Sequence, residues 1–501
     1  MSTLNAASAP PPGVLAMVDI RGRALDAEQA DFLSRHGIRA VCLFRANLGT
    51  EDEVRRLTSQ LREVMGPRAL IGVDHEGGSV VRASFLPHPP AAMALGAAGD
   101  ADLAHRVGTA VGRGLRSVGI NWNFAPVLDV NNNPDNPVIA ERSFGADPLE
   151  VARLAGAWML GAMDAGVACC CKHFPGHGDT SVDSHHDLPV VDKPLADLQA
   201  MELAPFHALR QRAPAFMSAH ILYPQLDSGF PATLSQPILG ALLREDWGFN
   251  GVVITDSLVM KAITQRFGYE RAAVLALQAG ADMVMAQGSR EEQGAALDGI
   301  AAAIAHGALA PATVARARAR LDALAERFPA GELPYAGRQR EMDERTMSEA
   351  WARALTRIGA AAPPPRHARL RVVAQRQVPG DRVSEAGIGG ERVARLFAHF
   401  TDAQIMLVDD LPSLRWDQLP ADGRTCVLVS NVRPRYGEAA RAWRPDLHIV
   451  LWNPFQVCDV AAPALVTWGY AEAALDAVQA WLHGQLDATG RAPVPLAPRA
   501  E

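Results

Sequence analysis

The sequence lacks the features that mark several large classes of protein. None of its apolar runs approaches the roughly 20 residues that a membrane-spanning helix needs. Its net charge is −7 and it has no basic cluster, which argues against nucleic acid and against an anionic membrane as partners. The first dozen residues are polar and proline-rich without an apolar core, so we expect no secretory signal.

Cysteine is scarce and is not arranged for metal binding or for disulfides. There is no CxxC pair, and three of the six cysteines are consecutive within one apolar run. Neighbouring side chains on a strand point to opposite faces, so these three cannot all pair. We interpret the cysteines as free thiols of a reducing compartment and predict a cytoplasmic protein. They are Cys42, Cys169, Cys170, Cys171, Cys426 and Cys458.

What the sequence does contain is a regular alternation of apolar runs and amphipathic segments. The chain of 501 residues exceeds the size of a single hydrophobic core, so we expect two domains. Continuous apolar strands indicate a parallel sheet covered on both faces, and eight of them predict an α/β fold of the (β/α)₈ TIM-barrel type. A doubly wound sheet is the alternative. The runs are 14–20, 40–44, 69–73, 120–127, 167–171, 215–218, 251–255 and 281–285.

A second domain follows the predicted barrel. We expect the barrel to occupy residues 13–360 and the proline-rich residues 361–366 to form a linker. Five more apolar runs alternate with helical segments in residues 367–490, which predicts a smaller α/β sandwich domain. Residues 491–501 are expected to be a frayed tail. The five runs are 370–374, 404–408, 425–430, 447–452 and 464–468.

Polar residues follow five of the eight barrel runs. They are Asp74, Asp129, Lys172, His220 and Asp256. In a barrel the carboxyl ends of all strands meet at one rim, so these residues would share a pocket. A doubly wound sheet would spread them along an edge. This pattern favours the barrel.

Asp256 is the first candidate for catalysis. It comes directly after a fully apolar strand. One interpretation is that its carboxylate caps the following helix. The other is that it is a nucleophile, which attacks an anomeric carbon and forms a glycosyl-enzyme.

Asp183 and His185 form a second candidate pair. Two residues apart on an extended loop, their side chains lie on the same side, so the carboxylate can accept a hydrogen bond from the imidazole. That contact orients the ring and raises its pKa. A histidine held in this way can protonate a leaving oxygen and later accept a proton from water. The alternative is a surface loop whose polar residues serve no chemistry.

A metal site is a rival interpretation of the same loop. Histidine and carboxylate side chains can bind zinc or iron. The first strand, however, carries no H-x-H pair, and Lys172 would repel a dication. We therefore expect no cofactor, and keep a metal-dependent barrel hydrolase as an alternative. The candidate ligands are His173, His177, Asp179, His185, His186 and Asp187.

Other residues have the chemistry to hold a sugar. A carboxylate such as Asp74 can accept hydrogen bonds from two vicinal hydroxyls, and the planar donor forks of Arg82 and Arg142 can reach the rim. Lys172 and His173 add two donors at the end of a strand. The alternative for Asp74 and Arg82 is a structural salt bridge behind a turn.

Taken together, these motifs resemble glycoside hydrolase family 3, in its β-N-acetylglucosaminidase (NagZ-like) branch. They occur in the order of that family and span most of residues 13–360. The motifs are DHEGGSVVR at Asp74–Arg82, ERSFG at Glu141–Gly145, KHFPGHGDTSVDSH at Lys172–His185, SAH at Ser218–His220 and TDSLVM at Thr255–Met260.

The resemblance implies a retaining exo-β-N-acetylglucosaminidase. In that case Asp256 is the nucleophile and His185, supported by Asp183, is the acid/base. The implied substrates are N-acetylglucosaminides, including the muropeptides of cell-wall recycling. A phosphorylase or another β-glycosidase of the same family is the nearest alternative, and a non-catalytic sugar-binding protein is a more distant one. The implied sugar-binding residues are Asp74, Arg82, Arg142, Lys172 and His173.

Overall fold

The structure is a computed structural model that describes residues 11–182, 187–380 and 383–496. Its contacts divide the chain into two compact units. The first consists of Met1–Asp74, Gly112–Ala125 and Met163–Pro334, and the second of His75–Val111, Pro126–Ala162 and Tyr335–Glu501. Two segments from the first third of the chain therefore pack with its C-terminal part.

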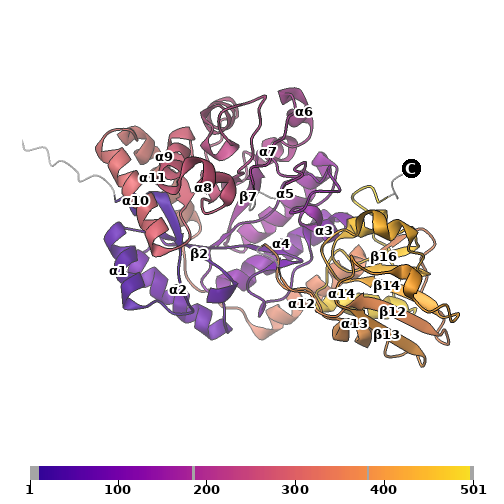
Figure 1. The fold of residues 1–501 in the computed structure, drawn as a ribbon. Helices are drawn as coiled ribbons and strands as arrows, with labels where there is room; N and C mark the ends of the chain where they lie inside the picture. Colours follow the sequence, from indigo (N-terminus) through magenta and orange to yellow (C-terminus); the bar gives the residue numbers. More distant parts are fainter. Residues whose placement is uncertain (1–10, 183–186, 381–382, 497–501) are drawn as a thin grey trace, which may run out of the picture. The chain divides into compact units, whose positions relative to one another are not determined.

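The first unit contains a closed barrel of parallel strands in the order β1-β10-β9-β8-β7-β6-β3-β2. Each of the eight predicted apolar runs contributes one strand, which confirms the TIM-barrel prediction (Figure 1). The strands are β1 (Ala16–Asp19), β2 (Ala40–Leu43), β3 (Leu70–Val73), β6 (Trp122–Asn123), β7 (Ala168–Phe174), β8 (Ala215–Ser218), β9 (Val252–Ser257) and β10 (Met283–Met285).

Alternate residues of these strands fill the inside of the barrel, as expected where neighbouring side chains point to opposite faces. One buried cluster contains two residues each from several strands, for example Ala215 with Met217 and Ala168 with Cys170. The helix α11 (Pro311–Arg327) contributes Leu324 to the same cluster.

Helix α11 lies across the amino ends of the strands. Asp322 of α11 accepts a hydrogen bond from Arg39, which directly precedes β2, at 2.7 Å. Arg320 of α11 donates to Asp282, which directly precedes β10, at 3.0 Å. These contacts close the amino end of the barrel and leave the carboxyl ends at the opposite rim.

The other helices of the first unit connect successive strands of the barrel, except α10, which follows the last strand, β10 (Figure 1). Some have strong end signals: Thr50 and Glu53 form a capping box that starts α2. The helices are α1 (Ala27–His36), α2 (Glu51–Met65), α6 (Leu195–Ala200), α7 (Ala204–Leu209), the π-helix η5 (Gln236–Asp246), α8 (Lys261–Phe267), α9 (Tyr269–Ala279) and α10 (Arg290–Ala305).

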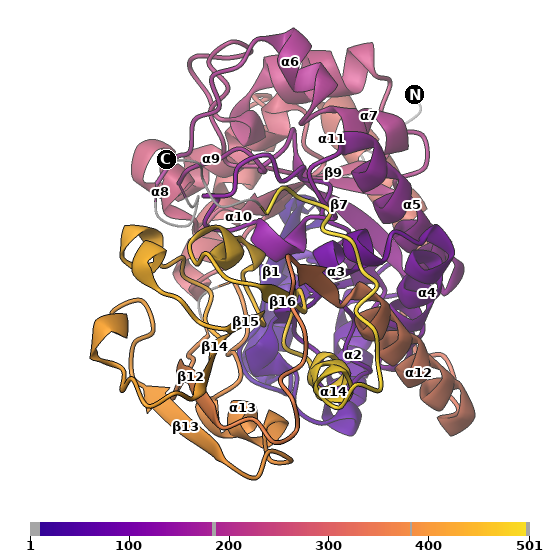
Figure 2. The same cartoon turned by 90° about the vertical axis from the view of Figure 1, so that its right-hand side faces the viewer.

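The second unit contains a six-stranded sheet in the order β11-β16-β15-β14-β12-β13 (Figure 2). Its strands are parallel except β11, which pairs antiparallel with β16. Strand β11 precedes the proline-rich residues 361–366, so the sheet takes one edge from residues ahead of that segment. The strands are β11 (Thr356–Ile358), β12 (Leu370–Gln375), β13 (Ala403–Val408), β14 (Thr425–Ser430), β15 (Leu447–Val450) and β16 (Ala464–Val466).

Helices and a small hairpin complete the second unit. The hairpin joins β4 (His75–Gly77) to β5 (Val80–Val81), and helix α12 (Gly337–Ala354) packs against both α3 (Ala92–Ala98) and α14 (Glu472–Leu482). Helix α13 (Gly390–Leu396) packs on β12. Helices α4 (Ala101–Ser117) and α5 (Pro148–Asp164) begin in this unit and end in the first. Among the described residues, no helix is long and apolar enough to cross a membrane.

Candidate active site

Polar residues stand at the carboxyl ends of the barrel strands in the first unit. Lys172 and His173 lie within β7, and Asp256 lies within β9. His220 follows β8, which pairs with both of those strands. Asp74 directly follows β3 at the same end of the barrel. This rim is where the active sites of TIM barrels lie.

The structure brings Lys172 and Asp74 together as an ion pair. The Nζ atom of Lys172 donates to Oδ1 of Asp74 at 2.5 Å, and the two side chains are 3% and 21% exposed. A lysine so deeply buried needs a partner, because burial disfavours an unpaired charge. The pair places a carboxylate acceptor beside an ammonium donor, an arrangement that can bind the hydroxyl groups of a sugar.

Asp256 is the second-last residue of strand β9 and does not lie at the start of a helix. The next helix, α8, begins at Lys261, and the residue before it, Met260, is its N-cap. The interpretation of Asp256 as a helix cap is therefore wrong. Its Oδ1 atom accepts a hydrogen bond from the backbone N–H of Ser257 at 2.7 Å, and the side chain is half-buried.

His220 supports the backbone beside Asp256. The imidazole is buried, with Nε2 at 2.9 Å from the carbonyl oxygen of Ser257 and Nδ1 at 2.8 Å from Oγ1 of Thr233. Because a carbonyl only accepts, Nε2 carries a proton and donates to it. The end of β8 thus fixes the end of β9. Sequence reasoning placed His220 at a strand end but assigned it no role.

The loop after β7 is anchored where it leaves the barrel. The Tyr223 hydroxyl donates to the carbonyl of Gly176. Gly176 has a φ of 142°, and a Cβ atom there would lie 2.7 Å from Cβ of Glu202, so only glycine fits. Further along, Oγ1 of Thr180 lies 2.8 Å from Nδ1 of His177. The His177 ring meets the ring of His173 edge-on, with 5.6 Å between their centroids.

Lys193 connects this loop to the protein interior. Its Nζ atom lies 2.6 Å from Oδ2 of Asp179 and 2.6 Å from Oε1 of Glu202, which is fully buried. Burial alone would lower the pKa of Lys193, but the hydrogen bonds to the two carboxylates raise it above its ordinary value. Sequence reasoning missed this residue, because a lone lysine in a polar loop carries no pattern of its own.

Asp183 and His185 lie outside the described residues, as does His186. Within 11–182, 187–380 and 383–496, no group of three or more histidine, cysteine, aspartate or glutamate side chains is placed to hold a metal ion. Of the ligands considered for a metal, Asp187 lies 3.4 Å from Arg266.

In the second unit, Arg142 is engaged by Glu76 of the Asp74–Arg82 motif. Its Nε and Nη2 atoms each donate to one carboxylate oxygen at 2.8 Å, and both side chains are 6% exposed. Such a bidentate, buried pair has a fixed geometry. The structure therefore shows Arg142 oriented by a neighbouring carboxylate, a contact that the sequence did not predict.

Arg82 also forms a salt bridge, with a distant partner. Its Nη1 atom donates to Oε1 of Glu385 at 2.7 Å, and its Nη2 atom donates to the carbonyl of Val383 at 2.7 Å. Nearby, the buried carboxylate of Glu141 accepts hydrogen bonds from the Ser79 hydroxyl at 2.7 Å and from the Trp452 indole at 2.8 Å. Two of the sequence motifs are thus tied to the C-terminal part of the chain.

Comparison with known proteins agrees with the motifs. The family model described as the glycosyl hydrolase family 3 N-terminal domain matches residues 13–324. A beta-hexosaminidase of Idiomarina loihiensis is 37% identical over 274 residues, which are 54% of this chain and 82% of that protein. A beta-hexosaminidase of Chromobacterium violaceum is 40% identical over 294 residues, which are 57% of this chain and 82% of that protein.

Two solved structures extend the comparison. A glycoside hydrolase family 3 beta-N-acetylglucosaminidase from a Paenibacillus species has a TM-score of 0.89 and 31% identity, covering 98% of this chain and 99% of its own. NagZ from Neisseria gonorrhoeae, in complex with N-trifluoroacetyl-D-glucosamine, has a TM-score of 0.52 and 32% identity. That match covers 62% of this chain and 98% of NagZ. The first similarity extends over the C-terminal residues as well.

Proposed function

The chain belongs to glycosyl hydrolase family 3, and from this premise we propose that it is a retaining exo-β-N-acetylglucosaminidase. The reaction removes terminal β-linked N-acetylglucosamine from a glycoside. The names of the relatives, beta-hexosaminidase and beta-N-acetylglucosaminidase, support N-acetylglucosamine as the sugar that is released. The position of Asp256 supports its role as the nucleophile. Its carboxylate ends a barrel strand on the rim that also carries the Lys172–Asp74 pair, and it caps no helix.

In the proposed mechanism Asp256 attacks the anomeric carbon. One carboxylate oxygen forms a bond to C1, the bond from C1 to the leaving oxygen breaks, and the protonated imidazole of His185 gives its proton to that oxygen. In the second step water attacks C1, His185 takes a proton from the water, and the ester to Asp256 breaks. Two inversions retain the β configuration.

The two catalytic groups need opposite protonation states at the start. Asp256 has to be ionised while His185 is protonated, and Asp183 raises the imidazole pKa in this proposal. We expect a bell-shaped pH profile of kcat/KM whose basic limb moves to lower pH in Asp183→Asn. An unmoved limb would refute the pair.

The sugar is held, in the proposal, by the donors and acceptors of the five residues that the family resemblance indicates. Asp74 and Lys172 supply an acceptor and a donor on the rim, and His173 supplies a second donor. Arg82 and Arg142 complete the set, and their guanidinium groups are oriented by Glu385 and Glu76 respectively. Because these carboxylates already hold the guanidinium groups in one orientation, each arginine side chain loses less conformational entropy when the sugar binds.

The first experiment measures release from a chromogenic β-N-acetylglucosaminide by the full chain. Asp256→Ala should lower kcat by about 10³-fold or more, because a nucleophile is removed from a unit of groups that act together. Asp298→Ala, on the exposed side of α10, is the matched control and should keep its activity. A fluorinated glycosyl donor should label Asp256, seen by mass spectrometry. Full activity of Asp256→Ala, or loss of activity with a chelator, would contradict the mechanism.

For the natural substrate we propose fragments of peptidoglycan recycling, cleaved in the cytoplasm. The six cysteines are all free and four of them are buried, which is typical of proteins from a reducing compartment. The test compares kcat/KM for a disaccharide of N-acetylglucosamine with that for an N-acetylglucosaminyl-anhydro-muropeptide. A preference for the muropeptide supports recycling, and a preference for the disaccharide points to chitin-derived substrates.

A further inference from the structure

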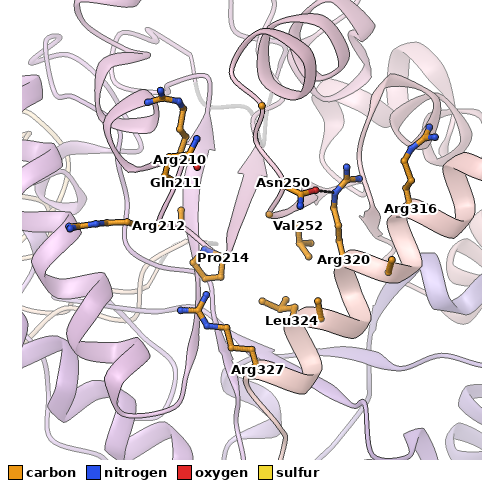
Figure 3. A pocket seen from close by; sticks show the side chains of 15 residues that line it. Arg210, Gln211, Arg212, Pro214, Asn250, Val252, Arg316, Arg320, Leu324 and Arg327 are labelled. Carbon is orange, nitrogen blue, oxygen red and sulfur yellow. Dashed lines mark hydrogen bonds between the residues drawn. The ribbon is translucent and has the colours of Figure 1, made fainter.

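The carboxylate of Asp256 lies where the regular pairing of β9 with β8 has ended. This pairing begins at the amino end of the two strands, where the Val252 N–H donates to the Pro214 carbonyl at 3.0 Å. Figure 3 shows these two residues next to each other. The last pair of the two strands is Ser218 with Thr255. Asp256 and the residue after it lie beyond that pair, so their positions depend on other contacts.

The pairing on the other side of β9 is irregular at the same place. Ile254 is paired with Met283 of β10. Three residues later Ser257 is paired with Met285, which is only two residues further along β10. An extra residue of this kind interrupts the ladder and changes the direction of a side chain. Two side chains supply hydrogen bonds there, and the first is Thr255, whose Oγ1 atom accepts from the Met285 N–H at 3.0 Å.

The second side chain is that of His220, which follows β8. Its Nε2 atom donates to the carbonyl oxygen of Ser257 at 2.9 Å, two residues beyond the last backbone pair of β8 and β9. Its Nδ1 atom lies 2.8 Å from Oγ1 of Thr233, and the ring is buried. The Ser218 hydroxyl donates to the same Thr233 oxygen at 3.0 Å. The imidazole is therefore held at both of its nitrogen atoms.

The backbone of Ser257 connects His220 to the carboxylate of Asp256. The Ser257 carbonyl also accepts from the Met260 N–H at 3.2 Å. The N–H of the same peptide group, which belongs to Leu258, donates to the Met285 carbonyl at 3.1 Å. This peptide group is thus fixed at both ends. On its other side, the Ser257 N–H donates to Oδ1 of Asp256 at 2.7 Å, so a fixed Ser257 fixes the donor that orients the carboxylate.

His220 lies on the outer side of the barrel wall. Ala215 and Met217 of β8 belong to the buried cluster inside the barrel, so the next residue, Ser218, points outward. Ser218 and His220 both contact Oγ1 of Thr233, which places the imidazole on the outer side as well. Its contact with the reacting groups therefore passes through the backbone.

We propose that His220 is a positioning residue for the nucleophile. The inference rests on the proposed retaining mechanism and gives His220 no contact with the sugar. Its hydrogen bond to the Ser257 carbonyl keeps the carboxylate of Asp256 aligned with the anomeric carbon. A misplacement of about 1 Å can cost about 10²-fold in rate. The loss of this hydrogen bond should therefore lower kcat and leave KM nearly unchanged, because other residues bind the sugar.

Two substitutions separate the two contacts of the ring. In His220→Gln the amide nitrogen can take the place of Nε2 and donate to the Ser257 carbonyl, whereas the shorter side chain in His220→Asn reaches only the place of Nδ1. We expect His220→Asn to lower kcat by about 10- to 100-fold and to change KM less than about twofold. His220→Gln should recover most of that loss. The matched control is His207→Asn, which changes an exposed histidine of α7 and should keep the wild-type values.

The rate at which a fluorinated glycosyl donor labels Asp256 measures the attack itself. We expect His220→Asn to slow this labelling by about tenfold or more. No labelling of the wild type would overturn the proposed glycosidase, and this inference with it. Equal labelling rates in the wild type and in His220→Asn would overturn the positioning role alone.

Circular dichroism and urea unfolding verify that the variants are folded. If His220→Asn does not fold, Thr233→Val replaces it, because valine has the shape of threonine but lacks the hydroxyl that contacts Nδ1. Its kcat should fall by about fivefold, the effect of one lost hydrogen bond, at an unchanged KM. An unchanged kcat in the variant that folds, equal losses in His220→Asn and His220→Gln, or a rise in KM in place of the fall in kcat would contradict the proposal.

Discussion

Replacing Glu385 by alanine should reveal how strongly the C-terminal part of the chain holds Arg82. The substitution removes the carboxylate that lies 2.7 Å from Nη1 of Arg82. It leaves the backbone contacts of residue 385 in place, where the N–H donates to the Ser79 carbonyl at 2.8 Å and the carbonyl accepts from the Tyr470 hydroxyl at 3.1 Å. The change therefore tests the ion pair and little else.

The magnitude follows from burial. Breaking a fully buried ion pair by removing one partner costs about 3–5 kcal/mol, because the other charge is left uncompensated. The Arg82 side chain is 11% exposed, but that of Glu385 is 28% exposed. Water can therefore partly replace the carboxylate, and Arg82 keeps the Val383 carbonyl. We expect a loss of about 2 kcal/mol in the free energy of unfolding.

Equilibrium unfolding in urea, followed by tryptophan fluorescence, measures this loss. The matched control is Glu472→Ala, which breaks an ion pair with Arg392 whose side chains are 71% and 22% exposed. An exposed pair contributes about 0–1 kcal/mol, so the control should lose far less. If Glu385→Ala destabilises the protein no more than Glu472→Ala does, the reasoning from burial is wrong. KM for the glycoside should rise in Glu385→Ala, since a loosened Arg82 binds the sugar less well in our proposal.

Two further predictions concern buried groups. Burial lowers the pKa of His448 to about 3. In the unfolded chain His448 binds a proton below about pH 6.5, whereas in the native protein it does so only below about pH 3. His448 therefore costs no stability above about pH 6.5 and destabilises the fold progressively as the pH falls toward 3. Between pH 7 and pH 4.5 the stability of His448→Gln should fall by about 3 kcal/mol less than that of the wild type, measured by urea unfolding at each pH; an equal fall would contradict the sign. The second prediction is that a thiol reagent modifies at most two cysteines of the native protein, Cys426 and Cys458, and all six after unfolding. The other four cysteines are buried, and burial raises the pKa of Cys169, Cys170 and Cys171, so their reactive thiolate form is scarce. Rapid modification of more than two would show that the barrel opens.

The barrel could be predicted because its strands are continuous apolar runs. Each run overlaps an observed strand, although the run 120–127 yields only Trp122–Asn123, and strands β7 and β9 extend beyond their runs to Phe174 and Ser257. Strand β11 was missed because it is three residues long and pairs with β16 far along the chain. Local patterns do not encode pairings over such a separation.

The rim residues were found for a similar reason. Lys172 and Asp256 stand at the ends of recognisable strands, so the topology alone brings them to one rim. The partners that orient the donor forks were not found. Glu76 is close to Arg142 only because the chain folds back, and Glu385 is 303 residues from Arg82. Contacts of this kind depend on tertiary packing and cannot be predicted from the local sequence around either partner.

The way the chain is shared between its two units decides how this enzyme can be cut or recombined. Residues 75–111 and 126–162 lie within the stretch that matches the family model, yet they pack with residues 335–501. A gene truncated at the proline-rich segment would remove the Trp452 indole from the buried Glu141 carboxylate and the Ser384 hydroxyl from Ser79. We therefore expect that residues 13–360 cannot be transferred to another protein without the C-terminal residues that pack against them. A chimera with a shorter relative such as NagZ, which matches 62% of this chain, should exchange residues 75–111 and 126–162 together with the C-terminal residues that pack against them.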